Sequence, residues 1–398
     1  MPPTPPTTYR PSRNWCPIST PQPARRRTAH AHHPACRRST FAHRRSRFQG
    51  RRGQRPSVRS GPSTARHCIG EHWRRPVNSD TRSDSRLARA IAVTNGKGGV
   101  RKTSIVANLA TRYAEGDRGY RVLVIDLDPQ GNLINHFGLA DHPQNNGGLG
   151  LVTALVEDQD LPVIHDVRPK VDLIVGGPRL KMLENAATFE EVIEAGGLET
   201  LFVQRIAELV DAAGYELVII DTPPSLGLQQ ALALHTARYV LIPVGLDQDS
   251  WDGVRGIGPL VSRARKNGNP DITYLGFVVT GLDVNAKSYI EDAKDYIESL
   301  ELDPPIPLFD TFIRYTPTGG RARNFGLLVH ELAAKRNEFE LARRKALRDY
   351  RRGNTDIEVP KPIAMTVHDL ADDYFDLAKE VLTKINQHEQ AASTAEGE

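Results

Sequence analysis

Residues 87–104 read LARAIAVTNGKGGVRKTS, and this stretch decides the fold. The apolar run 87–95 suits a buried β-strand. It leads into the glycine-rich turn 96–104, and a helical pattern, SIVANLATRYAE, begins at Ser104. A strand, such a turn and a helix in this order favour phosphate binding, because the N–H groups of the turn and the helix dipole both attract an anion. A glycine-rich turn without a ligand is the alternative.

The residues of this turn define the expected phosphate site. Lys102 would reach the β- and γ-phosphates of a nucleotide, and the Thr103 hydroxyl would bind Mg²⁺. The predicted binding set is Gly96, Lys97, Gly98, Gly99, Val100, Arg101, Lys102, Thr103 and Ser104.

Two further apolar stretches end in aspartate. Residues 122–132, VLVIDLDPQGN, place Asp126 and Asp128 at the tip of a strand, and residues 216–225, ELVIIDTPPS, end a strand at Asp221. Ligands of open α/β sheets sit at such carboxyl ends. We expect Asp126 and Asp221 to serve the metal and Asp128 to orient the attacking water. Polar strand ends that cap turns are the alternative.

Apolar runs and helical patterns alternate along the rest of the chain. The runs are RVLVIDLD (121–128), VDLIVGG (171–177), ELVIIDTPP (216–224), RYVLIPV (238–244), ITYLGFVVT (272–280) and IPLFDTFI (306–313). Because they are continuous rather than alternating, both faces of each strand should be buried. The sequence therefore predicts an α/β fold in which helices cover both faces of a predominantly parallel sheet.

The chain divides by charge. Residues 1–90 hold 20 Arg and no Lys against three acids, a net charge of +17, so the remainder carries −13 within the total of +4. We expect residues 1–86 to form a disordered Arg/Pro-rich leader. A DNA-binding arm, an idle linker and an upstream stretch read from a start codon assigned too early are its three explanations. A folded domain over 87–385 and a disordered acidic tail over 386–398 complete the expected organisation.

Composition excludes several classes of function. No run approaches the roughly 18 apolar residues of a membrane span, and the leader has no apolar signal core. The cysteines, Cys16, Cys36 and Cys68, all fall in the leader, which excludes a disulfide framework or a thiolate metal cluster from the folded part. We expect a cytoplasmic protein whose chemistry uses oxygen and nitrogen groups.

Together these motifs resemble the ParA/MinD branch of P-loop ATPases with a deviant Walker A box, and ParA-type partition proteins in particular. The likeness runs from Leu87 to Leu382, and its most specific parts are DPQGN (128–132) and IIDTPPS (219–225). It implies ATP and Mg²⁺ as cofactors and the roles given above for Lys102, Thr103 and the three aspartates. It also implies an ATP-sandwich homodimer in which Lys97 reaches the partner's phosphates, so Lys97, Lys102 and Asp128 are the expected catalytic residues.

One residue departs from the family pattern. The family writes KGGVGKT, and this chain writes KGGVRKT, with Arg101 in place of glycine. A side chain there strains the loop by roughly 1 to 3 kcal/mol, or its guanidinium binds phosphate. An active ATPase and a nucleotide-binding protein that has lost hydrolysis both remain open.

The resemblance also implies non-specific DNA binding by the ATP-bound dimer at the nucleoid, and a ParB-like centromere-binding partner. Because the body is acidic, DNA affinity requires a local basic patch. The candidates are Arg314, Arg321 and Arg323, and Arg343, Arg344 and Arg348 within a basic insertion over 335–360. A solvated charged helix is the alternative for the insertion. The chain ends without the basic amphipathic helix of MinD-like members, so we expect no membrane partner.

The predicted function is thus ATP-driven partition of plasmid or chromosomal DNA. Positioning of a non-DNA cargo, or a non-hydrolysing scaffold, are the alternatives. Three lone histidines, His136, His235 and His330, have no paired ligand at metal spacing and are predicted to be structural.

Overall fold

The computed structural model describes residues 85–188, 190–282, 287–299 and 305–395. These residues fall in one compact unit, Arg74–Glu398. The predicted leader, apart from its last two residues, lies outside the described residues. Within the described part no helix is both long enough and apolar enough to cross a membrane.

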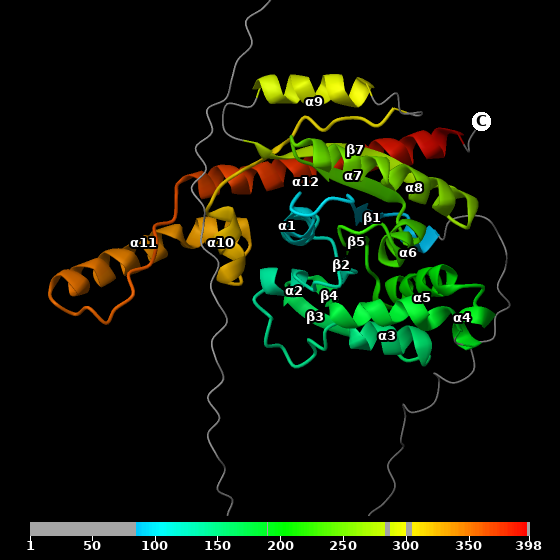
Figure 1. Ribbon diagram of the computed structural model, residues 1–398, viewed down its shortest axis with the longest axis horizontal. Coiled ribbons are helices and arrows are strands. Elements are labelled where there is room, and N and C mark those ends of the chain that lie inside the picture. The colour runs from blue at the N-terminus through cyan, green and yellow to red at the C-terminus, as the bar shows by residue number, and fades with distance from the viewer. Residues whose placement is uncertain (1–84, 189, 283–286, 300–304, 396–398) are drawn as a thin grey trace, which may run out of the picture. The chain divides into compact units, whose positions relative to one another are not determined.

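An eight-stranded sheet with the order β3-β4-β2-β5-β1-β6-β7-β8 forms the centre of this unit (Figure 1). Its strands are β1 (Ala90–Val93), β2 (Val122–Asp126), β3 (Val163–Arg168), β4 (Val171–Ile174), β5 (Leu217–Asp221), β6 (Tyr239–Val244), β7 (Thr273–Leu282) and β8 (Ile313–Arg314). Every pairing is parallel except that of β3 with β4. The predicted α/β class is confirmed.

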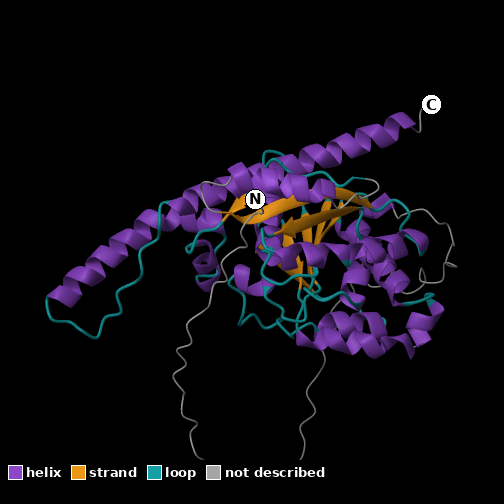
Figure 2. Ribbon diagram, turned by 45° about the horizontal axis from the view of Figure 1, so that its top comes forward, coloured by secondary structure: helices purple, strands orange, loops and turns teal. Residues whose placement is uncertain are grey.

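Helices cover both faces of the sheet (Figures 1 and 2). One face packs α3 (Leu149–Val156), α5 (Leu198–Ala213), α6 (Leu228–Thr236), α7 (Gln248–Arg255), α8 (Ile257–Lys266) and α9 (Lys287–Ser299), with η2 (Pro178–Thr188) and α4 (Glu190–Glu194) beside them. The other packs α1 (Lys102–Glu115), α2 (Leu133–His136), α10 (Gly319–Asn324), α11 (Val329–Arg351) and α12 (Thr366–Ala395). The residues of β1, β2 and β5 are buried on both faces, as their continuous apolar runs predict.

Helix α11 extends away from the rest of the unit (Figure 2). Only Val329, Leu332 and Ala333 of this helix are buried, and they lie in its first turn and a half. Arg168 on β3 anchors this start, because its guanidinium bonds to the Glu331 carboxylate at 2.5 Å. In the later turns of α11, Phe339 is the one described residue that packs against the core, and it is only partly buried.

Two predicted segments in the C-terminal third differ in length from those in the structure. The run 306–313 forms a strand only at its end, because Pro305 and Pro307 lack an N–H to donate to a ladder; Leu308 makes an isolated bridge to Phe277. The tail expected to be disordered from residue 386 continues α12 to Ala395. An ion pair of 2.6 Å between Arg89 and Glu389 holds this last part of the helix against the start of the domain.

Candidate functional site

The turn between β1 and α1 has the backbone shape that a phosphate cradle requires. Gly99 and Arg101 both adopt left-handed conformations, with φ of 84° and 67°. The Ile105 N–H bonds to the Arg101 carbonyl at 2.9 Å and starts helix α1. Gly96 passes so close to α7 that an added Cβ would stand 3.0 Å from the Gly253 carbonyl oxygen. Glycine at position 96 is thus dictated by packing.

Lys102 places its ammonium group inside this turn. Its Nζ donates to the carbonyls of Asn95 at 2.9 Å and Lys97 at 2.8 Å, and the residue is only 6% exposed. Burial lowers the pKa of Lys102, while the nearby Asp221 and Asp128 raise it. A largely desolvated cation at the centre of a glycine-rich loop is suited to bind the phosphates of a nucleotide.

The predicted aspartates meet at the same edge of the sheet. Asp126 and Asp221 are paired across β2 and β5. Asp126 accepts hydrogen bonds from the N–H groups of Asp128 at 2.9 Å and Leu133 at 3.2 Å. Asp128, almost buried, accepts one from the N–H of Gln130 at 2.8 Å. The turn DPQGN is therefore shaped by the carboxylates that the sequence singled out.

Asp221 is the least satisfied group of the site. It is fully buried, and its carboxylate oxygens form no hydrogen bond of regular geometry in the described part of the chain. Burial raises its pKa to about 7, while the nearby Thr103 hydroxyl and the charge of Lys102 oppose the shift. Burial, with the charge of Asp221, also raises the pKa of Asp126. Two buried carboxyls that repel each other favour a nearby cation.

Magnesium fits this donor set. Thr103, Asp126 and Asp221 offer hard oxygen ligands, and the orphaned oxygens of Asp221 would accept from water bound to the metal. Among the described residues no cluster of three His, Cys, Asp or Glu side chains forms a complete metal site. Mg²⁺ usually completes its shell with water and substrate phosphates rather than with protein groups.

Lys97 lies at the outer side of the turn and is held by helix α7. Its Nζ bonds to Asp249 at 2.5 Å and lies 3.5 Å from Asp247. The bond to Asp249 is the main reason that the pKa of Lys97 is raised. Asp247 caps α7 by accepting from the Ser250 N–H at 3.0 Å. Within this single chain Lys97 therefore faces α7.

Arg101 has the left-handed backbone that the glycine of the family pattern would supply. Its guanidinium lies 5.4 Å from the ring centre of Tyr315, in the loop after β8, rather than in the turn with Lys102. Of the two expectations for this residue, the left-handed conformation that carries strain is confirmed.

The predicted basic residues differ in how far they are engaged. Arg314 is only 21% exposed and binds Asp373 at 2.8 Å and Asp369 at 3.4 Å. Arg321 donates to the carbonyls of Pro362 and Lys361. Arg343 binds the Pro360 carbonyl at 3.1 Å and lies 3.8 Å from Glu340.

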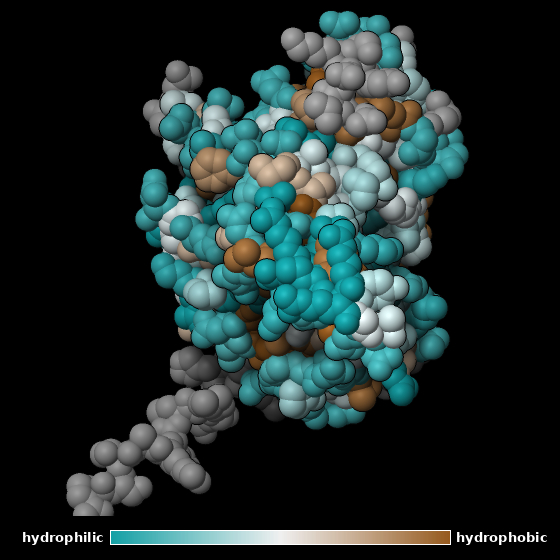
Figure 3. All heavy atoms as spheres, turned by 90° about the vertical axis from the view of Figure 1, so that its left-hand side faces the viewer, coloured by the Kyte–Doolittle hydropathy of each residue, from teal (hydrophilic) through white to brown (hydrophobic). Residues whose placement is uncertain are grey.

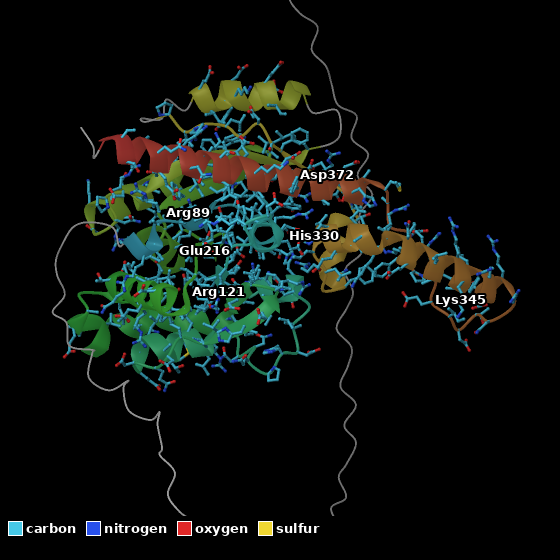
Figure 4. All side chains as sticks on the ribbon, turned by 180° about the vertical axis from the view of Figure 1, so that it is seen from behind. Arg89, Arg121, Glu216, His330, Lys345 and Asp372 are labelled. Atoms are coloured by element: carbon cyan, nitrogen blue, oxygen red, sulfur yellow. The ribbon has the colours of Figure 1, made fainter. Side chains whose placement is uncertain are left out.

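Arg344 and Arg348 are exposed on the projecting part of α11 and form no ion pair with any described residue. Lys345, labelled in Figure 4, marks this part of the helix. Figure 3 looks at the molecule from the side on which α11 projects, and the surface there is predominantly hydrophilic. The helix thus offers the free cations that Arg314 and Arg321 do not.

One residue of the site was missed by the sequence analysis. Asn95 is fully buried at the end of β1; its side chain accepts from the Lys97 N–H at 2.8 Å and donates to the Pro243 carbonyl at 2.8 Å. It ties the phosphate turn to β6. The available signal was a polar amide at the end of an apolar strand.

We predict that Asp221→Asn makes the folding stability of the nucleotide-free protein depend less on pH between about 4 and about 7. The folded Asp221 carboxyl holds its proton to a higher pH than the unfolded chain does, so folding stability falls as pH rises from about 4 to about 7. A shift of about three pH units is worth up to about 4 kcal/mol. Melting temperatures at pH 5 and pH 8 check this. If the melting temperature fell equally between pH 5 and pH 8 in the natural protein and in Asp221→Asn, the role of Asp221 would be contradicted.

Comparison with known proteins agrees with this geometry. The profile of the family described as AAA domain matches residues 88–274. The chain is 31% identical over 232 residues to the sporulation initiation inhibitor protein Soj of Bacillus subtilis, covering 56% of this chain and 85% of Soj. It is 29% identical over 225 residues to the chromosome partitioning protein ParA of Myxococcus xanthus, covering 56% and 76%.

Among solved structures, apo McdA from Cyanothece has the same fold, with a TM-score of 0.53 at 20% identity, over 74% of this chain and 99% of that one. The phosphate turn, the two aspartate-ended strands and the similarity to Soj lead to one assignment. The chain belongs to the ParA/MinD family of P-loop ATPases, close to the ParA-type partition proteins.

Proposed function

We propose that this protein binds ATP with Mg²⁺, dimerises around the nucleotide and acts in the partition of plasmid or chromosomal DNA. The observation that carries the proposal is the presence, beside one glycine-rich turn, of a buried Lys102 side chain bonded only to backbone carbonyls and of the unsatisfied carboxylate of Asp221. Both groups gain partners when a phosphate and its metal enter. Bound Mg²⁺ would neutralise charge on the transferred phosphoryl group.

The residues of this chain then take distinct roles. The turn and Lys102 hold the phosphates, and Thr103, Asp126 and Asp221 hold the metal and its water. Asp126 also fixes the turn that presents Asp128. Asp128, whose Oδ1 accepts from the Gln130 N–H, would orient the attacking water.

Lys97 has a role that depends on dimerisation. To reach a partner's phosphates it must leave Asp247 and Asp249, which hold it in the single chain. A phosphate is a stronger partner for an ammonium group than two exposed carboxylates. Nucleotide binding and subunit association would therefore be linked through this residue.

Non-specific DNA association belongs to the same proposal. The exposed cations of α11 support it, because contacts of Lys and Arg with phosphates provide most non-specific affinity. A ParB-like centromere-binding protein is the proposed partner, by analogy with the partition proteins that the chain resembles.

The test of the ATPase activity compares the natural protein with Arg101→Gly, in the presence of Mg²⁺ and DNA. We expect both to release phosphate and the glycine form to do so roughly tenfold faster, because relief of about 1 to 3 kcal/mol of strain eases movement of the loop. Arg101→Ala, which removes the side chain but keeps the backbone cost, is the matched control and should stay slow.

Phosphate release by the glycine form alone would favour the second candidate, a nucleotide-dependent DNA-binding protein that no longer hydrolyses ATP. The left-handed Arg101 is the observation behind that candidate. Release by neither form would contradict the ATPase role.

A further inference from the structure

A cavity of about 160 Å³ lies between α1, α2, α10 and α12, beside the phosphate turn. Its polar wall consists of Arg101, Ser104, Asn108, His136, Arg323 and Tyr374. No carboxylate contributes to this lining. The described residues thus enclose a space whose charged groups are all of one sign.

The two guanidinium groups at this cavity have no acidic partner. Neither Arg101 nor Arg323 forms an ion pair with any residue that the structure describes. Arg314, from the neighbouring strand β8, is by contrast paired with both Asp373 and Asp369. Asp369 and Asp373 of α12 are therefore already paired, and no described carboxylate forms an ion pair with Arg101 or Arg323 that would compete with an anion.

His136, the last residue of α2, supplies an independent sign of a ligand. It is 8% exposed, and its ring nitrogens have no hydrogen-bond partner within the described ranges. Burial and the charge of Arg323 lower its pKa to about 4, so the imidazole is neutral and donates from one nitrogen. Its ring nitrogens are not among the fully buried atoms without a partner, so they face open space, and the residue lines the cavity. The sequence analysis took this histidine to be structural, and its place in the cavity wall also allows it to donate to a ligand.

We propose that this cavity binds a small oxyanion, a phosphate or a carboxylate, between Arg101, Arg323 and His136. Guanidinium groups bind both chemical classes through paired N–H donors, and the Ser104 hydroxyl offers one more donor. A cavity of about 160 Å³ has room for a small oxyanion together with water. Because Arg101 belongs to the phosphate turn, an anion here would contact the loop from its outer side.

The test measures binding of inorganic phosphate and of malonate to the full chain by calorimetry, with sodium chloride at matched ionic strength as the blank. We expect Arg323→Gln and His136→Asn to weaken binding by at least about tenfold, the loss typical of one charge-assisted hydrogen bond. Arg344→Gln, an equal loss of charge on α11 away from the cavity, should change nothing. Arg323→Lys, which keeps the charge, should recover part of the affinity.

Lys102→Ala separates this site from the nucleotide site. Oxyanion binding that survives Lys102→Ala but not Arg323→Gln supports the cavity, whether or not the protein binds ATP. The reverse pattern places the anion on the phosphate turn and overturns the proposal, as does a response no larger than that to chloride. The tighter of the two probes identifies the ligand class. Arg323 is exposed, so its variants should fold, and a melting curve for each confirms it.

Discussion

Replacing Lys102 with alanine is expected to abolish ATP-dependent dimerisation. The ammonium group already lies inside the phosphate turn, held only by two backbone carbonyls, and is the sole cation there among the described residues. Its removal takes away charge-assisted hydrogen bonds to phosphate worth about 1.5 to 3 kcal/mol each, so ATP affinity should fall at least about a hundredfold. Light scattering with and without ATP measures the dimer fraction.

The fold should survive this change. Burial lowers the pKa of Lys102, so its charged form bears a desolvation cost in the folded protein and its loss need not destabilise the empty site. Lys266→Ala, at the exposed end of α8, is the matched control and should dimerise like the natural protein. A dimer fraction that ATP still raises in Lys102→Ala would refute the phosphate role.

Neutralising the projecting part of α11 is expected to have the second largest effect, on DNA binding. The variant carries glutamine at Arg343, Arg344, Arg348 and Arg351. Each lost phosphate contact reduces the slope of log affinity against log salt by about 0.9, so four contacts remove about 3 to 4 from the slope. Affinity at low salt should fall by several orders of magnitude, measured by fluorescence anisotropy on random duplexes.

The control removes the same charge from the opposite face of the sheet. It carries glutamine at Arg255, Arg263, Lys266 and Lys294, which lie on α7, α8 and α9. If both variants lose equal affinity, total charge decides binding and α11 is only a solvated helix. If neither variant loses affinity for DNA, the hypothesis that this surface of α11 binds DNA is wrong.

The sheet was largely predictable because its inner strands are short apolar runs, and each run is followed by polar residues of the candidate site. β2 and β5 end in Asp126 and Asp221, and β1 leads into the turn that precedes Lys102. Parallel strands bring such ends to one edge of the sheet. The sequence therefore predicted which residues meet before the structure showed how. The candidate site residues could be predicted from local motifs because the parallel strand order brings the separate motifs together.

What was missed depends on contacts between distant segments. β3, VIHDVR, has a mixed polar pattern because it is an edge strand and its central residues His165 and Asp166 are exposed. The last turns of α12 read as a polar tail, but Arg89 lies 300 positions earlier in the chain and pairs with Glu389. No local pattern reports such a partner.

Arg101 shows a third limit. The sequence showed that a side chain stands where glycine belongs, and the expected backbone strain is present, but it did not reveal the direction of the guanidinium. That direction depends on Tyr315 and on the loop after β8, which packs beside the turn only in the folded chain.

The first turn and a half of α11 is buried in the core, and Phe339 packs against the core farther along the helix. The part of the helix beyond Phe339 is thus free to change in sequence and length without disturbing the nucleotide site. Relatives with the same phosphate chemistry would then differ most in this projecting part of α11. Exchanging this part between them should transfer the affinity for the surface that it contacts and leave the rate of ATP hydrolysis unchanged.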